Sequence, residues 1–122
     1  MYSVEVKYAS KELTARERIQ IKDTTDTTKL DEATQLEAVI IDVDWYAILN
    51  IHNDKAEDSE YETYIVVDRN GERFRTGSQS FWSAFTNIAT ELDNEEEPWS
   101  IKVYRMPSKN RAGKDFITCS LI

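Results

Sequence analysis

The chain has 122 residues, of which 40% are hydrophobic, 11% aromatic and 31% charged. This mix predicts a single folded domain, residues 1–122, because apolar residues are frequent enough to offset the entropy lost on folding. Every apolar run is shorter than the roughly 20 residues of a membrane-spanning helix, so no membrane contact is expected. The polar start after Met1 predicts no secretory signal peptide, and the single cysteine, Cys119, excludes an internal disulfide and favours a cytosolic protein.

Charge is distributed unevenly along the chain, whose net charge is −8. Residues 23–62 contain twelve acidic residues and two lysines, whereas residues 99–114 contain five basic residues and no acidic one. The overall charge argues against binding of nucleic acid by the molecule as a whole, but a local basic strip remains compatible with it. Either segment is also compatible with an ordinary solvated surface.

The first third of the chain is predicted to add a strand hairpin to the main fold. Its elements are a strand at Ser3–Tyr8, a strand at Arg18–Lys22, a loop at Asp23–Thr28 and a short helix at Lys29–Gln35. The second strand is predicted from Ile19 and Ile21, which lie two residues apart as in a strand with one buried face. Thr28 is expected to cap the short helix.

The middle of the chain is rich in strand-forming residues. Leu36–Asp42 and Trp45–His52 are predicted strands, and they are compatible with one long strand bent at Asp42–Asp44. Tyr61–Asp68 and Glu72–Thr76 flank Asn70-Gly71, which predicts a hairpin with a type I′ turn.

Counting outward from that turn pairs Val67 with Phe74 and Ile65 with Thr76 on one face of the hairpin. The other face then carries Val66 with Arg75, Asp68 with Arg73, and Tyr64 further along the strand.

The last third predicts one long helix and two strands. Ser78 or Ser80 caps a helix that extends to about Asp93, with Phe81, Phe85, Ile88 and Leu92 on one face. The strands Trp99–Met106 and Phe116–Leu121 follow, joined by a long basic loop at Pro107–Gly113. Ile101, Val103, Ile117 and Cys119 are expected to face the core, and Lys102, Tyr104 and Phe116 to face outward.

The order of elements predicts a mainly β fold. Residues 36–122 match an OB-like five-stranded barrel with one helix between its third and fourth strands, and residues 1–35 form an N-terminal extension. An α+β sheet with one helix on its face gives the same order and stays open as an alternative.

Two stretches of the sequence resemble a known group of proteins. They are Thr76-Gly77-Ser78-Gln79-Ser80-Phe81-Trp82-Ser83-Ala84-Phe85 and Pro107-Ser108-Lys109-Asn110-Arg111-Ala112-Gly113-Lys114-Asp115-Phe116-Ile117-Thr118-Cys119, with weaker matches at Tyr8–Leu13 and Ile51–Asn53. The group consists of small acidic proteins from phages and integrative elements of Gram-positive bacteria. The resemblance implies a single-stranded-DNA-binding role in the cytoplasm of a bacterial host. The chain departs from common bacterial single-strand binders, since it ends in Ser120-Leu121-Ile122 rather than in a tail with an acidic tip.

The residues themselves favour binding over catalysis. A binder of single strands needs aromatic rings for stacking and cations that follow the phosphates. The candidate nucleic-acid-binding residues are Tyr64, Arg73, Arg75, Lys102, Tyr104, Arg105, Lys109, Arg111, Lys114 and Phe116. No catalytic residue, metal ligand or cofactor is expected, because the single histidine, His52, and the single cysteine lack the partners that such sites need.

Three functions are therefore weighed for the chain. The first is an OB-like protein that binds single-stranded DNA in replication or recombination. The second is an acidic inhibitor whose segment 23–62 mimics phosphates and binds a host nuclease or another defence protein. The third is a nuclease that holds magnesium through Asp42 and Asp44.

Overall fold

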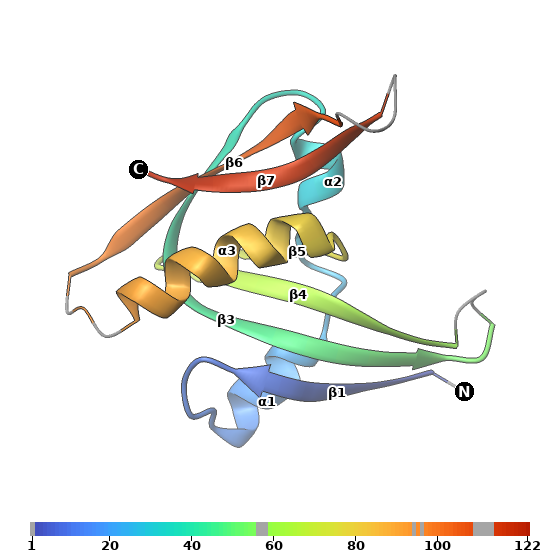
Figure 1. Ribbon diagram of the computed structural model, residues 1–122. Coiled ribbons are helices and arrows are strands. Elements are labelled where there is room, and N and C mark those ends of the chain that lie inside the picture. Colours follow the sequence, from blue (N-terminus) through green and yellow to red (C-terminus); the bar gives the residue numbers. More distant parts are fainter. Residues whose placement is uncertain (1, 56–58, 94, 96, 109–113) are drawn as a thin grey trace.

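A computed structural model describes residues 2–55, 59–93, 95, 97–108 and 114–122 (Figure 1). The elements in chain order are β1 (Tyr2–Ala9), α1 (Ala15–Lys22), β2 (Thr28–Lys29), α2 (Leu30–Ala33), β3 (Val39–Asn53), β4 (Glu60–Asp68), β5 (Arg73–Thr76), α3 (Gln79–Leu92), β6 (Trp99–Pro107) and β7 (Asp115–Leu121). The protein is mainly β with one long helix, as the sequence predicted. None of the described helices has the length and apolar character needed to cross a membrane.

The seven strands form one sheet with the order β2-β5-β4-β3-β6-β7, and β1 pairs with β3. One edge of β3 pairs with β4, while its other edge pairs first with β6 through Val39–Val43 and then with β1 through Ala47–Asn53. The sheet curls around α3 as an open half-barrel (Figure 1). We call the face that packs on α3 the inner face and the opposite face the outer face.

The predicted bend at Asp42–Asp44 is a β-bulge inside a single long strand. The register of β3 with β4 shifts between Val43 and Trp45. Because one extra residue is inserted there, the side chains after Val43 change faces. Trp45, Tyr46 and Ala47 are buried in succession because both faces of the sheet are covered: Trp45 and Ala47 lie in one core and Tyr46 in the other. The bulge therefore brings Tyr46 to the inner face, where it joins Ile41 and Val43.

Helix α3 fills the inner side of the half-barrel. Ser78 is its N-cap and accepts a hydrogen bond from the Phe81 backbone N–H, which confirms one of the two predicted caps. Phe81 and Phe85 are fully buried and Ile88 is partly buried, so the predicted helix face is the one that packs. The inner core contains Leu30, Ile41, Val43, Tyr46, Val66, Phe74, Phe81, Phe85, Ala89, Ile101, Val103, Ile117 and Cys119.

A second core lies on the outer face, under α1. It contains Leu13, Ile21, Trp45, Ala47, Leu49, Ile51, Ile65 and Val67. The expected strand at Arg18–Lys22 is wrong, because this segment belongs to α1, which begins with a capping box between Thr14 and Glu17. Only Ile21 is buried, at 2% exposed, while Ile19 is 71% exposed, so their two-residue spacing did not mark a strand face. The N-terminal segment therefore adds a strand and a covering helix rather than a hairpin.

The short helix α2 also differs from its prediction. Thr28 lies in β2, which pairs in parallel with β5, and the helix begins after Lys29 without a side-chain cap. The OB-like expectation of five strands is not confirmed, since the sheet has seven.

The β4–β5 hairpin forms as predicted, but its register is shifted by one residue. Gly71 has a positive φ of 86°, whereas Asn70 does not adopt a positive φ, so the turn is not of type I′. The Gly71 N–H donates to the Asp68 carbonyl, and the Asp68 N–H donates to the Glu72 carbonyl, which leaves three residues in the loop. As a result Val66 pairs with Phe74, and the pairs Val67–Phe74 and Ile65–Thr76 expected from the sequence are wrong.

Candidate nucleic-acid interface

Large apolar side chains remain exposed on the outer face where β3 begins and where β6 pairs with β7. Ile40 is 54% exposed, Met106 43% and Phe116 38%. Ile40 pairs with Lys102, and Met106 pairs with Phe116, so these side chains share one side of three adjacent strands. We call this surface, with Tyr104, Lys114 and Ser120, the β6–β7 face.

Tyr104 is held in place at the centre of the β6–β7 face. Its hydroxyl is hydrogen-bonded to the hydroxyl of Ser120 on the neighbouring strand, with 2.7 Å between the oxygens. The Lys102 ammonium lies 5.8 Å from the centre of the Tyr104 ring. The ring is thus tied to β7 at its polar end and has a cation over one of its faces, which agrees with the predicted outward positions of both residues.

Lys114 extends the face at the loop end of β7. It is exposed, and its carbonyl accepts a hydrogen bond of 2.9 Å from the Ser108 N–H. This bond continues the β6–β7 ladder beyond the pair Pro107–Asp115. Lys114 precedes Phe116 by two residues, the period of one strand face, and so lies on the same side of β7. Lys109 and Arg111, the other cations predicted in this loop, lie outside the described residues.

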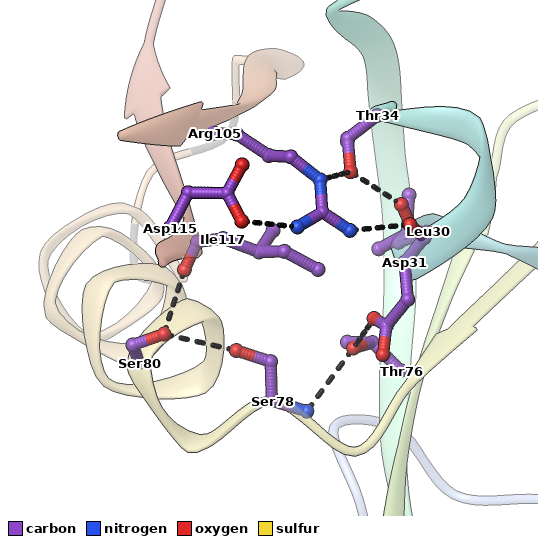
Figure 2. Close-up of polar contacts among 9 residues, drawn as sticks. All are labelled: Leu30, Asp31, Thr34, Thr76, Ser78, Ser80, Arg105, Asp115 and Ile117. Atoms are coloured by element: carbon purple, nitrogen blue, oxygen red, sulfur yellow. Dashed lines mark hydrogen bonds and ion pairs between the residues drawn. The ribbon is translucent and has the colours of Figure 1, made fainter. Parts of the chain in front are cut away.

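Arg105 does not belong to the β6–β7 face, which corrects its predicted role. It pairs with the buried Ile117 and therefore points to the inner side. Figure 2 shows its guanidinium between α2 and the start of β7: it donates to the Thr34 hydroxyl and to the Asp31 carbonyl, and it forms an ion pair with Asp115 at 2.8 Å. Arg105 ties β6 to α2, and all three of its guanidinium nitrogens donate a hydrogen bond there.

A chain of smaller contacts continues from Arg105 to the start of α3 (Figure 2). The Thr76 hydroxyl donates to the Asp31 carboxylate and accepts from the Ser78 N–H, while the Ser80 hydroxyl donates to the Ile117 carbonyl at 2.8 Å. These contacts join β5, α2, α3 and β7 at the side where the sheet stays open.

The three candidate binding residues of the β4–β5 hairpin also lie away from the β6–β7 face. Tyr64 is 6% exposed on the inner face, and its ring stacks on Trp82 with centroids 4.6 Å apart. The Arg73 guanidinium donates to the carbonyls of Gln20 and Asp23, and the Arg75 Nε donates to the Thr27 hydroxyl at 2.8 Å. Tyr64 faces inward because the register of the hairpin is shifted by one residue. Arg73 and Arg75 are occupied because the N-terminal helix, which was not predicted, and the loop after it lie next to them.

Sequence reasoning missed three members of the β6–β7 face. Ile40, Met106 and Ser120 were counted only as residues of predicted strands. The alternation that predicted Lys102 and Tyr104 as outward also applies to Met106, so that signal was available. The proximity of Ile40 depends on the pairing of β3 with β6, which no local pattern encodes.

The described residues give no support to a metal-dependent nuclease. No group of three His, Cys, Asp or Glu side chains among them is arranged to hold a metal ion. The Asp42 carboxylate accepts a hydrogen bond of 2.6 Å from the Ser100 hydroxyl, on the outer face. Burial raises the pKa of the Cys119 thiol to about 12, so this thiol stays protonated and is a poor nucleophile at neutral pH.

Three carboxylates of segment 23–62 lie on different parts of the molecule. Asp31 lies on α2 against Thr76, Asp42 is on the outer face, and Glu62 pairs with Lys7 on the side of Tyr64.

Comparisons with protein-family models, with curated proteins and with solved structures find no match for this chain.

Proposed function

We propose that the protein binds single-stranded nucleic acid, with single-stranded DNA as its ligand, on the β6–β7 face. The observation that carries the proposal is the fixed Tyr104 ring, with Lys102 beside it and the exposed Phe116 ring on the adjacent strand. Aromatic rings next to cations are what sequence-tolerant binding of single strands requires, because every base offers a face for stacking.

The order of strands supports an OB-like origin for this arrangement. From β3 to β7 the chain reads three strands, a long helix and two strands, which is the order of an OB-fold. In this account β1 and β2 are additions to an OB-like half-barrel. The loop between β6 and β7 then corresponds to the last OB loop, which contacts ligands in that fold.

The distribution of charge supports binding of a single-stranded nucleic acid at one restricted part of the surface. The chain carries a net charge of −8, yet residues 99–114 contain no acidic residue. A phosphate backbone is repelled by the net charge of the molecule and attracted by the run of cations at Lys102, Lys114 and the sequence between them. Binding is therefore expected to weaken steeply as salt rises, by roughly 0.7 in the log–log slope for each phosphate contact.

The proposal is tested by fluorescence anisotropy of a labelled oligothymidine at low and moderate salt. Phe116→Ala is expected to weaken binding by about 1–3 kcal/mol, the usual effect of removing one stacking ring. Tyr61→Ala is the matched control, because Tyr61 is 39% exposed on β4 and lies outside the face. Equal affinities of the two variants would exclude the β6–β7 face as the site.

Absence of binding by the wild-type protein at low salt would contradict the proposed function itself. The alternative of an acidic inhibitor would then be tested by searching for a stable complex with host nucleases.

A further inference from the structure

Four side chains of the β6–β7 face follow one another at nearly constant steps. Lys102 and Tyr104 are two residues apart on one face of β6, a step of about 6.6 Å. Tyr104 pairs with Thr118, so Phe116 is its diagonal neighbour on β7, at about 7–8 Å. Lys114 precedes Phe116 by two residues, a further step of about 6.6 Å. The order is therefore cation, ring, ring, cation, with steps of about 7 Å.

The spacing of these side chains matches the spacing of bases in a nucleic-acid single strand whose bases are unstacked, and it is too wide for stacked bases. Bases in a duplex strand are about 3.4 Å apart, and a single strand whose bases are unstacked is more extended than that. The backbone positions that carry the two rings are about 7–8 Å apart, so the rings can each receive one of two adjacent bases when those bases are unstacked from each other. Paired bases in a duplex already stack on both sides, so a flat sheet face cannot reach them.

The first ring is fixed before any ligand arrives. The hydrogen bond between Tyr104 and Ser120 restricts the ring, which lowers the entropy that binding would otherwise cost. Lys102 lies close enough to contact the phosphate next to a base on that ring. Ile40 beside Lys102 and Met106 beside Phe116 supply apolar surface around the two rings.

On the basis of the proposed function, we infer that the β6–β7 face holds two adjacent unpaired bases, one on Tyr104 and the next on Phe116. The flanking phosphates lie at Lys102 and Lys114, so about four nucleotides fill the site. Ser120 is a positioning residue, because it acts on the ligand only through the Tyr104 ring.

The inference is tested with hexanucleotide backbones in which only two positions carry thymine and the others are abasic. With the two thymines adjacent, both rings are used. With one abasic position between them, one stacking contact is lost, and affinity is expected to fall at least about 5-fold. Equal affinity of the two ligands would overturn the two-base arrangement while leaving single-strand binding intact.

A length series separates this inference from the proposed function. Affinity for oligothymidine is expected to rise steeply from two to four nucleotides and then to grow only with the number of binding registers. A continued steep rise beyond about eight nucleotides would contradict the four-nucleotide site. Failure of every length to bind at low salt would contradict the proposed function instead.

The role of Ser120 is tested by a double-mutant cycle with Tyr104→Phe and Ser120→Ala. Each change removes the same hydrogen bond, so each is expected to weaken binding by about 2- to 10-fold, and the pair no more than either alone. Ser83→Ala on the exposed side of α3 is the control. Additive effects, or an effect of Ser120→Ala that persists when Tyr104 is already Ala, would show that Ser120 acts independently of the ring.

Discussion

The outer face of the sheet is apolar at two places, and the chain covers only one of them. Between β3 and β4, side chains such as Trp45 and Ile65 are buried under Ile21 of α1. On the β6–β7 face, Met106 and Phe116 have comparable apolar character but no described element lies over them. One apolar region of the outer face is covered by α1 and the other is exposed. An exposed apolar region of this kind is typical of a surface that binds a ligand or a partner.

The cations of the two regions differ in the same way. Near the covered region, Arg73 and Arg75 donate to groups of the segment that links α1 to β2. On the β6–β7 face, Lys102 lies beside a tyrosine ring, and Lys114 is exposed at the end of the loop. The arginines tie β5 to the segment that follows α1, whereas the two lysines are exposed, as the proposed contacts with phosphates require.

The largest effect is expected from a substitution that disrupts the packing of α1 on the outer face. Ile21→Ala should lower the free energy of unfolding by about 2–5 kcal/mol, because a fully packed side chain leaves a cavity under α1. Ile19→Ala in the same helix should change it by no more than about 0.5 kcal/mol, since Ile19 is exposed. Urea denaturation measures both, and similar losses for the two variants would contradict the assignment of the buried side of α1.

A smaller effect is expected from the arginine that anchors the cover. Arg73→Met should cost about 1–3 kcal/mol of stability, because carbonyls at the end of α1 lose a charged donor. Oligothymidine affinity, measured on the folded variant, should stay unchanged. The exposed Arg16→Met serves as the control for removing a positive charge. A weaker affinity for Arg73→Met than for Arg16→Met would return Arg73 to the binding site.

The smallest effect on stability is expected on the β6–β7 face. Phe116→Ala should change the free energy of unfolding by no more than about 0.5 kcal/mol, because its side chain is partly exposed and lacks a covering element. Thermal denaturation followed by circular dichroism checks this. A decrease of more than about 2 kcal/mol in the free energy of unfolding would mean that Phe116 supports the fold, and would contradict the description of the β6–β7 face as a free surface.

Local patterns in the sequence predicted the elements that carry strong periodicity or a clear cap. The long helix, the bent strand and the alternation of β6 and β7 were all of this kind, so Lys102, Tyr104 and Phe116 were correctly expected to face outward. The placement of Tyr64 failed because a single residue in the turn decides which face each hairpin residue occupies.

The remaining errors concern contacts between distant segments. Arg73, Arg75 and Arg105 are cations in a basic or polar context, and their sequence neighbours do not reveal that backbone carbonyls and hydroxyls of residues 20–34 receive them. The covering role of α1 was missed for the same reason, since its apolar residues are few and only Ile21 is buried within the helix.

The most direct test of this comparison is an amide NMR titration of the labelled protein with oligothymidine at low salt. The account predicts chemical-shift changes concentrated at residues 102–106 and 116–120, with little change at Ile21, Trp45 and Ile65 under α1. Changes concentrated at the covered region, or spread evenly over both, would contradict the claim that the uncovered β6–β7 face is the binding surface.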